Sequence, residues 1–130
     1  MIVVDANVLA YLYLPGDHTA RAEALYQGDA EWQAPILWRS EFRNILAGFM
    51  RRKALTLEQA TEIQDKVEAF MSGKEYDVDS GRVLELVHDS DCSAYDCEYV
   101  ALAMQLDVRL VTMDARLLKA FPGRAFPLAG

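Results

Sequence analysis

The sequence has few cysteines, no repeat or low-complexity tract, and no long apolar run. Its two cysteines, Cys92 and Cys97, are five positions apart, so on one helix they face different directions and we expect no disulfide. Two thiols alone also make a poor zinc site. No stretch of about 18 apolar residues occurs, so we expect no membrane-spanning helix. The first residues lack the basic region of a signal peptide, which favours a cytoplasmic protein.

Basic side chains are the scarcer charged type. The chain has 13 Lys and Arg against 20 Asp and Glu, a formal net charge of −7. Net charge therefore does not attract this protein to nucleic acid or to an anionic membrane, and any nucleic-acid site needs a local reversal of sign. The composition, 52% hydrophobic and 25% charged over 130 residues, is globular and predicts a single domain over residues 1–130.

Short apolar runs alternate with helical periodicity along the chain. The pattern predicts an α/β sandwich with a mostly parallel central sheet flanked by helices. The expected strands cover residues 2–4, 32–36 and 108–112, with a possible edge strand at 125–126. The expected helices cover residues 6–14, 19–26 with Thr19 as cap, 37–52, 57–72 after a capping box at Thr56, 80–88 after Asp79, 94–106 after Ser93, and 115–120.

Four acidic residues occupy positions where such a fold concentrates chemistry. Asp5 follows the first strand directly, and Asp114 follows the strand at 108–112. The carboxyl ends of parallel strands share one edge of the sheet, where ligands bind. Glu41 lies at the border of the apolar stripe of its helix, and Asp96 lies in the first turn of its helix. Helix amino termini face the same edge, so we expect the four side chains to converge.

Converging carboxylates repel one another unless a cation lies between them. An all-oxygen donor set without histidine or thiolate suits Mg²⁺ better than Zn²⁺. A divalent ion held in this way can activate water and stabilise the charge of an in-line phosphoryl displacement. The pattern therefore predicts metal-assisted phosphodiester hydrolysis, which needs no Ser, His or Cys nucleophile.

Each acid also has an ordinary structural explanation. Asp5 and Asp114 are placed to cap the helices that follow them, and Asp96 is placed to complete a capping box with Ser93. Glu41 could extend from the edge of its apolar stripe into solvent. Four such coincidences at one edge are harder to explain than one, and Glu41 fits this explanation least well.

Four stretches of the chain together form a recognisable set. They are VVDAN at residues 3–7, WRSEFRNIL at 38–46, SAYDCEYVALA at 93–103 and LVTMD at 110–114. With these stretches the chain resembles the PIN-domain ribonucleases of the VapC toxin type. The resemblance covers nearly the whole sequence and keeps the order of the family's motifs, whereas residues 56–88 carry no family motif.

The resemblance implies a three-layer PIN fold that binds Mg²⁺ or Mn²⁺ through Asp5, Glu41, Asp96 and Asp114. Thr112 resembles the family's hydroxyl residue that supports the acids, and Asn7 is a second candidate for that role. The implied activity is that of an endoribonuclease toxin restrained by a cognate antitoxin. A homodimer is also expected, and exposed parts of the first and third helices are candidate surfaces for either protein partner.

Basic residues gather around the helix that carries Glu41. Two interpretations of this cluster stay open: an RNA-contacting patch, or, for its last three members, complementation of the helix carboxyl terminus. The cluster comprises Arg39, Arg43, Arg51, Arg52 and Lys53, and Arg116 near Asp114 is a further candidate. Most remaining acids fall between residues 58 and 91, and we expect them to lie away from this helix.

Aromatic side chains such as Tyr11 and Phe49 are able to stack on bases, but aromatics at helical spacing more often belong to a core. His18 and His88 stand in polar contexts and are expected on the solvated surface.

Three other functions compete with this interpretation. A receiver-like signalling domain would need a lysine at a late strand end and a phosphoacceptor aspartate at a middle one, and neither is found. A catalytically inactive PIN-like scaffold that only binds proteins is the main alternative, because retained acids do not prove turnover. DNA in place of RNA is an alternative substrate.

Overall fold

The computed structural model describes residues 1–129 and has a five-stranded sheet at its centre. The order of the strands is β3-β2-β1-β4-β5, and every neighbouring pair is parallel. The strands are β1 (Ile2–Val4), β2 (Trp32–Pro35), β3 (Glu75–Tyr76), β4 (Leu110–Val111) and β5 (Ala125–Phe126). The predicted α/β class with a parallel central sheet is confirmed.

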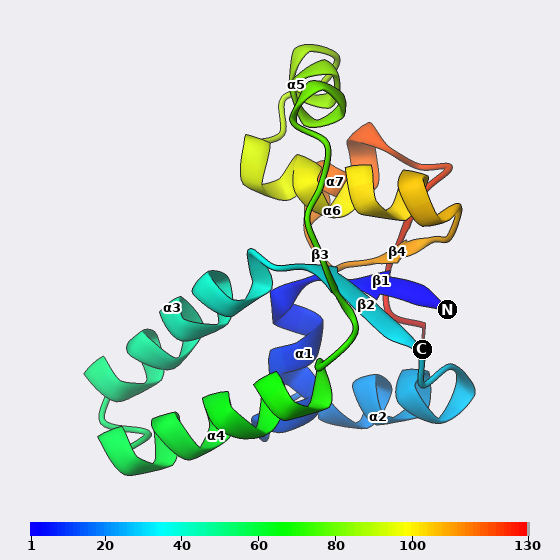
Figure 1. Ribbon diagram of the computed structural model, residues 1–130. Helices are drawn as coiled ribbons and strands as arrows, with labels where there is room; N and C mark the ends of the chain where they lie inside the picture. Colours follow the sequence, from blue (N-terminus) through cyan, green and yellow to red (C-terminus); the bar gives the residue numbers. More distant parts are fainter. Residues whose placement is uncertain (130) are drawn as a thin grey trace.

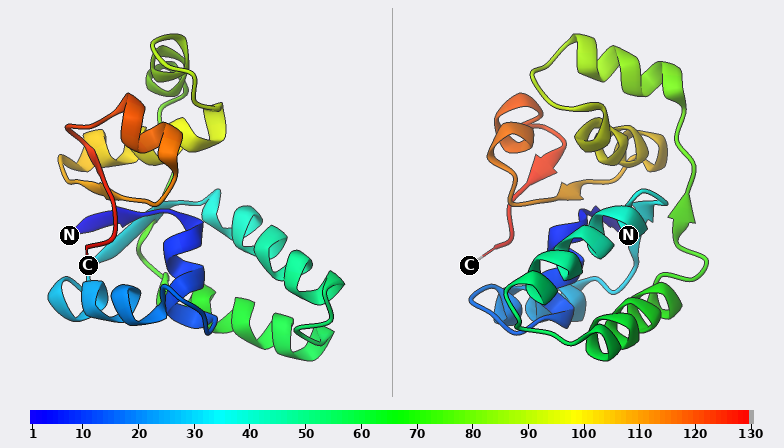
Figure 2. Two further views of the ribbon diagram at one scale, coloured as in Figure 1. Left: turned by 180° about the vertical axis from the view of Figure 1, so that it is seen from behind. Right: turned by 90° about the vertical axis from the view of Figure 1, so that its left-hand side faces the viewer.

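Helices cover both faces of the sheet and give the molecule three layers (Figures 1 and 2). On one face lie α1 (Ala6–Tyr13), α2 (Thr19–Gly28), α3 (Trp38–Arg51) and α4 (Leu57–Phe70). On the other lie α5 (Ser80–His88), α6 (Ala94–Leu106) and α7 (Ala115–Ala120). The helices α3 and α4 form an antiparallel pair that projects away from the sheet (Figure 1).

The core is built where the central strands meet the helices. Val3 and Val4 of β1 are completely buried, as expected for a strand covered on both faces. Trp32 and Trp38 are also completely buried, and the first of these donates its indole N–H to the Asp29 carbonyl at 2.8 Å. The core fixes β1 and β4 side by side, which brings the residues that follow them to one edge.

The edge strand β3 was not anticipated from the sequence. It pairs Glu75 with Ala34 and Tyr76 with Pro35. Neither strand residue is fully buried, and two residues show no periodicity that a pattern could reveal. The Tyr76 hydroxyl donates to Gln33 Oε1 at 2.8 Å. Side-chain contacts therefore help to hold this strand in place.

The prediction that Thr19 caps α2 was wrong. The N-cap residue is His18, and it makes no side-chain capping bond. The Thr19 hydroxyl instead accepts from the Gly16 N–H at 3.0 Å and donates to the Leu14 carbonyl at 3.2 Å. It therefore fixes the turn between α1 and α2. The strand expected at 108–112 is also shorter, because regular pairing with the neighbouring strands is confined to Leu110 and Val111.

Both cysteines of the described chain are free and buried. No helix within residues 1–129 combines the length and apolar character needed to cross a membrane.

Candidate active site

A cavity of about 450 Å³ opens at the carboxyl-terminal edge of β1 and β4. All four acids singled out in the sequence, Asp5, Glu41, Asp96 and Asp114, line it. The remaining lining residues are Ala6, Asn7, Leu37, Ser40, Asn44, Ile45, Tyr95, Tyr99 and Leu117. The predicted convergence of the acids at one edge is therefore met by the structure.

Asp5 is the most deeply placed of the four, with 7% of its surface exposed. Its Oδ1 accepts from the Val8 N–H at 3.0 Å and caps α1, while its Oδ2 accepts from the Thr112 hydroxyl. Burial raises the pKa of Asp5 to about 6, although the bonds from Thr112 and Val8 act to lower it. Without a cation, this carboxylate is costly to keep ionised.

Thr112 joins two of the acids. It is completely buried, and its hydroxyl donates to Asp5 and accepts from the Asp114 N–H at 3.0 Å. This contact places Thr112 where a residue that orients the acids would lie. Asn7 also lines the cavity, with an exposed side chain that makes no hydrogen bond to the acids within residues 1–129.

Glu41 is held by Tyr99, a residue whose part in the site was not recognised in the sequence. The Tyr99 hydroxyl donates to Glu41 Oε1 at 2.6 Å, and Tyr99 is 1% exposed. Burial, followed by the charge of Glu41, raises the pKa of Tyr99 well above its ordinary value, so its hydroxyl keeps the hydrogen it donates. Burial also raises the pKa of Glu41. The signal available in sequence was the position of Tyr99, one turn after Asp96 on the same face of α6.

Asp96 and Asp114 form the more open part of the site. Asp114 Oδ1 caps α7 by accepting from the Leu117 N–H at 3.0 Å. The Asp96 N–H donates to the Ser93 hydroxyl at 3.0 Å, but the Asp96 carboxylate completes no capping box. Burial and the nearby charge of Asp114 raise the pKa of Asp96.

The capping explanation is therefore correct for Asp5 and Asp114, but in each it uses a single carboxylate oxygen. The second oxygen of Asp114 accepts no hydrogen bond from residues 1–129. For Asp96 and Glu41 capping explains nothing, since neither carboxylate caps a helix.

The donor set fits a hard divalent cation. Oxygen atoms of four carboxylates surround the cavity, and burial penalises the negative charge of the three whose pKa is raised, Asp5, Glu41 and Asp96. Within residues 1–129 no three acidic, histidine or cysteine side chains are gathered tightly enough to enclose an ion by themselves. Carboxylate oxygens are the ligands that suit Mg²⁺ or Mn²⁺, which bind through a few carboxylates and keep several waters.

Of the predicted basic contacts, two lie close to the cavity. Arg43 donates to the hydroxyl of Ser40, a lining residue, at 3.0 Å. Arg116 is near enough to lower the pKa of Asp96, against the larger effect of burial. Arg51 and Arg52 lie about 15 Å further along α3, given a rise of 1.5 Å per residue from Glu41.

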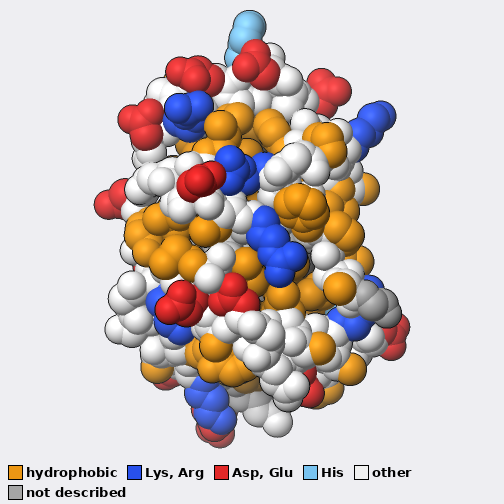
Figure 3. Space-filling model, turned by 90° about the vertical axis from the view of Figure 1, so that its right-hand side faces the viewer, with side chains coloured by type: hydrophobic (Ala, Val, Ile, Leu, Met, Phe, Trp, Pro, Cys, Tyr) orange, Lys and Arg blue, Asp and Glu red, His pale blue; other side chains and the backbone are white. Residues whose placement is uncertain are grey.

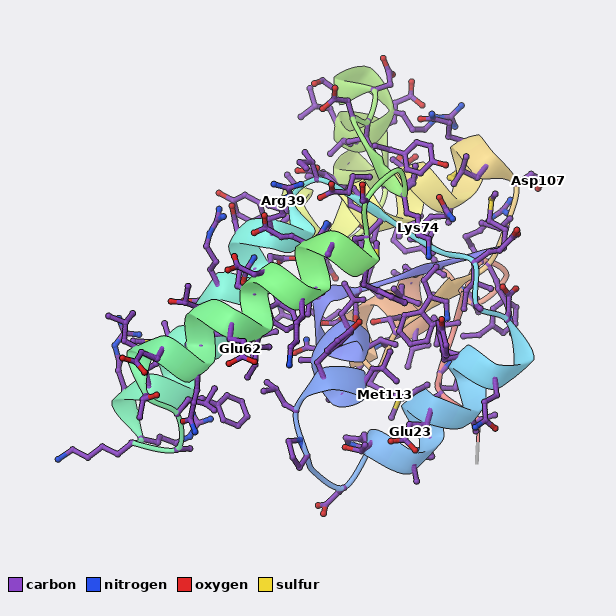
Figure 4. All side chains as sticks on the ribbon, turned by 60° about the horizontal axis from the view of Figure 1, so that its bottom comes forward. Glu23, Arg39, Glu62, Lys74, Asp107 and Met113 are labelled. Carbon is purple, nitrogen blue, oxygen red and sulfur yellow. The ribbon has the colours of Figure 1, made fainter. Side chains whose placement is uncertain are left out.

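Arg39 does not belong to an RNA-contacting patch, contrary to that interpretation of the sequence. Its guanidinium donates to both oxygens of Glu75, at 2.6 and 2.7 Å, and to Glu68 Oε1 at 3.1 Å. Figure 4 labels Arg39 near the start of α3, where it faces these acids. Its charge is therefore neutralised by the fold, and Glu75 also accepts from the Trp38 indole at 2.7 Å.

The same contact corrects the expectation that the acids of residues 58–91 lie away from the arginine-bearing helix. Glu68 of α4 binds Arg39 of α3 directly. Other acids do lie apart from it, and Figure 3 shows several at the top of one face, over α5.

Comparison with known proteins agrees with this geometry. The family model described as "PIN domain" matches residues 2–122. Ribonuclease VapC3 of Pyrobaculum aerophilum is 30% identical over 131 residues, which cover 97% of this chain and 98% of that protein.

Solved structures share the fold at lower sequence identity. The structure of FitAcB from Neisseria gonorrhoeae superposes with a TM-score of 0.72 and 18% identity, covering 97% of this chain and 96% of that one. A toxin–antitoxin complex from Klebsiella pneumoniae gives a TM-score of 0.70 and 14% identity, with coverage of 97% and 96%. At these identities the likeness concerns the fold alone.

Proposed function

This chain belongs to the PIN-domain family, and from that premise we propose that it is a divalent-metal-dependent endoribonuclease, the VapC-type toxin of a toxin–antitoxin pair. The observation that carries the proposal is the single cavity lined by Asp5, Glu41, Asp96 and Asp114. The ribonuclease relative, aligned over nearly the full length of both chains, supports the same activity.

In this mechanism the four acids hold Mg²⁺ or Mn²⁺, which when bound supplies charge stabilisation and a more acidic water for attack on phosphorus. Thr112 and the cap at Val8 fix the orientation of Asp5, so that it does not rotate away when the substrate arrives. Tyr99 does the same for Glu41 through Oε1, and Oε2 accepts no hydrogen bond from residues 1–129 and would be available to the cation or to a water.

Basic residues at the rim bind the substrate's phosphates. Arg43 and Arg116 stand nearest to the cavity, and Arg51 and Arg52 extend the positive charge along α3. Such contacts are independent of sequence and weaken with salt. Because the net charge is −7, the chain as a whole does not attract RNA, and binding depends on these local basic residues and on the metal.

The second protein partner is a cognate antitoxin, and the chain acts as a homodimer in the cytoplasm. The Klebsiella relative was solved as a toxin–antitoxin complex, which supports a partner of this kind. The net charge of −7 favours a partner with a basic segment. Exposed parts of α1 and α3 remain the proposed surfaces for these contacts.

The test is cleavage of single-stranded RNA by the purified chain, with and without chelator. We expect cleavage that requires Mg²⁺ or Mn²⁺ and that Asp5→Asn reduces at least about a hundredfold without unfolding the protein. Glu23→Gln is the matched acid-to-amide control, because Glu23 is exposed on α2 (Figure 4). Cleavage that survives the chelator, or that Asp5→Asn leaves unchanged, contradicts the proposal. Preference for single-stranded DNA contradicts the assigned substrate.

A further inference from the structure

A second hollow, of about 270 Å³, lies between α1, α3 and the turn that precedes α2. It shares two lining residues, Asn7 and Ile45, with the acidic cavity. The two spaces therefore lie next to each other on the same side of the molecule, with Asn7 and Ile45 between them.

Aromatic rings line the hollow. The rings of Tyr11 and His18 lie 4.5 Å apart between centroids at an angle of 42°, and Phe49 of α3 lines the hollow with them. The expectation that His18 is merely solvated surface was wrong, because it packs on Tyr11 and is half-buried. Rings that stay partly accessible beside a nuclease site offer the stacking surface that unpaired bases use.

Two guanidinium groups support these rings. The Arg21 guanidinium contacts Nδ1 of His18. Arg52 lies over the Phe49 ring, 4.7 Å from its centroid. Among the described lining residues Asp17 carries the negative charge, and it disfavours a phosphate in the hollow itself. The chemistry thus favours a neutral, flat, hydrogen-bonding group.

The spacing along the helices agrees with a position beside the cleaved bond. Tyr11 follows Asp5 by six residues and Phe49 follows Glu41 by eight. At 1.5 Å per residue the rings lie about 9 and 12 Å along their helices from these acids, a span that a nucleotide or two can bridge.

We propose that this hollow is a subsite for an unpaired nucleobase that flanks the cleaved phosphodiester. The base stacks on Tyr11 and Phe49, and its edge meets the imidazole of His18 and the carboxamide of Asn7. The inference rests on the proposed RNA substrate, and it makes cleavage selective for RNA in which this base is unpaired.

The test uses a short single-stranded RNA whose cleavage site has been mapped, with an abasic residue placed in turn at each flanking position. We expect one position at which the abasic residue raises KM about tenfold, the scale of one stacked base, with little change in kcat. Tyr11→Leu keeps apolar bulk against the core. For the intact RNA this variant raises KM by the same factor as the abasic residue does, and for the abasic RNA it raises KM no further. Tyr26→Leu on α2 is the aromatic control and leaves both values unchanged.

A second measurement detects the stacking without cleavage. In the Asp5→Asn background, 2-aminopurine at the sensitive position loses fluorescence on binding, and His18→Gln or Tyr11→Leu prevents that loss. Full cleavage of every abasic RNA, with Asp5→Asn still inactive, overturns the subsite and leaves the proposed function intact. Active Asp5→Asn overturns the proposed function instead. Variants that weaken antitoxin binding and leave KM for RNA unchanged assign the hollow to the protein partner and overturn the subsite.

Discussion

The inner and outer halves of the acidic cavity are held in different ways. The inner acids, Asp5 and Glu41, each accept a hydrogen bond from a hydroxyl far away in sequence: Thr112 is 107 positions from Asp5, and Tyr99 is 58 positions from Glu41. The carboxylate of the outer acid Asp114 accepts only from the helix that it begins, and the Asp96 carboxylate accepts no hydrogen bond within residues 1–129.

The difference separates acids oriented by tertiary structure from acids oriented by local structure. Burial is the first cause of the raised pKa of Asp5, Glu41 and Asp96 alike, so the pairs differ in the distant hydroxyl that holds each inner acid. The outer pair can exchange hydrogen bonds with water. We therefore infer that the inner pair sets the position of the cation and that the outer pair adapts to cation and substrate.

The largest effect should come from removing the charge of an inner acid. Glu41→Gln keeps the shape and the Tyr99 contact but lowers metal-dependent cleavage at least about a hundredfold, whereas Asp114→Asn costs less because water can replace its outer oxygen. Steady-state cleavage at several Mn²⁺ concentrations measures both. Equal losses from the two variants would remove the distinction between the halves.

The stability of the metal-free protein should depend on pH through Asp5. Its pKa is raised from 3.8 to about 6 on folding, so the folded state holds the proton more tightly than the unfolded state. The free energy of unfolding then falls as pH rises from about 4 to about 6, by up to about 3 kcal/mol. Other acids also change pKa on folding, Glu41 and Asp96 in the same direction and Glu75 in the opposite one, so the difference between wild type and Asp5→Asn isolates this contribution. Denaturant titrations with chelator present should show the variant gaining stability relative to the wild type over this pH range and being the more stable protein at pH 7. A difference between the two proteins that does not change with pH would refute the assignment.

Removing the hydroxyl that holds Asp5 should lower the affinity of the site for metal without removing a charge. Thr112→Val keeps the shape of the side chain but leaves Asp5 and the Asp114 N–H without their partner. We expect metal affinity about 10- to 100-fold lower, measured as the Mn²⁺ concentration that raises Tm by half its maximum. Thr112→Ser restores the hydroxyl and should recover most of the affinity; failure of this rescue would mean that Thr112 contributes packing alone.

The smallest effect is expected from Tyr99→Phe, which deletes one hydroxyl and keeps the buried ring. Glu41 loses its 2.6 Å bond but stays beside the cavity, so we expect about a tenfold loss of apparent Mn²⁺ affinity with kcat at saturating metal nearly unchanged. Tyr76→Phe, which removes the hydroxyl bonded to Gln33, controls for the loss of a buried bond elsewhere. A shift in Tm without a change in Mn²⁺ affinity would limit Tyr99 to a structural role.

The convergence of the four acids on one cavity could be predicted because their positions follow from local rules. Asp5 and Asp114 come directly after apolar strands and begin helices, and parallel strands end at a common edge. The partners of the inner acids were harder to find. Thr112 was suggested only by resemblance. The hydroxyl of Tyr99 on α6 meets Glu41 on α3, a helix of the other layer, and no periodicity encodes this contact.

The errors share the same physical origin. Arg39 was assigned to a basic patch because neighbouring residues are basic, yet its charge is cancelled by Glu68 and Glu75, about thirty or more positions away. His18 was interpreted from its polar neighbours, whereas Tyr11 of the preceding helix packs against it. The local sequence indicates which helix or turn a segment forms. The residues that pair with or pack against its side chains belong to distant segments that meet only in the folded chain.

The two edge strands, β3 and β5, each contain two residues. An outer strand this short exposes too few unpaired peptide groups for another strand to pair with it. Short edge strands therefore protect sheets from edge-to-edge aggregation. At β3 the Glu75 side chain is also fixed by Arg39 and Trp38, which anchors the edge to α3. Lengthening of the sheet by a partner strand is thereby disfavoured, which leaves the helical faces as the surfaces open to the proposed protein partner.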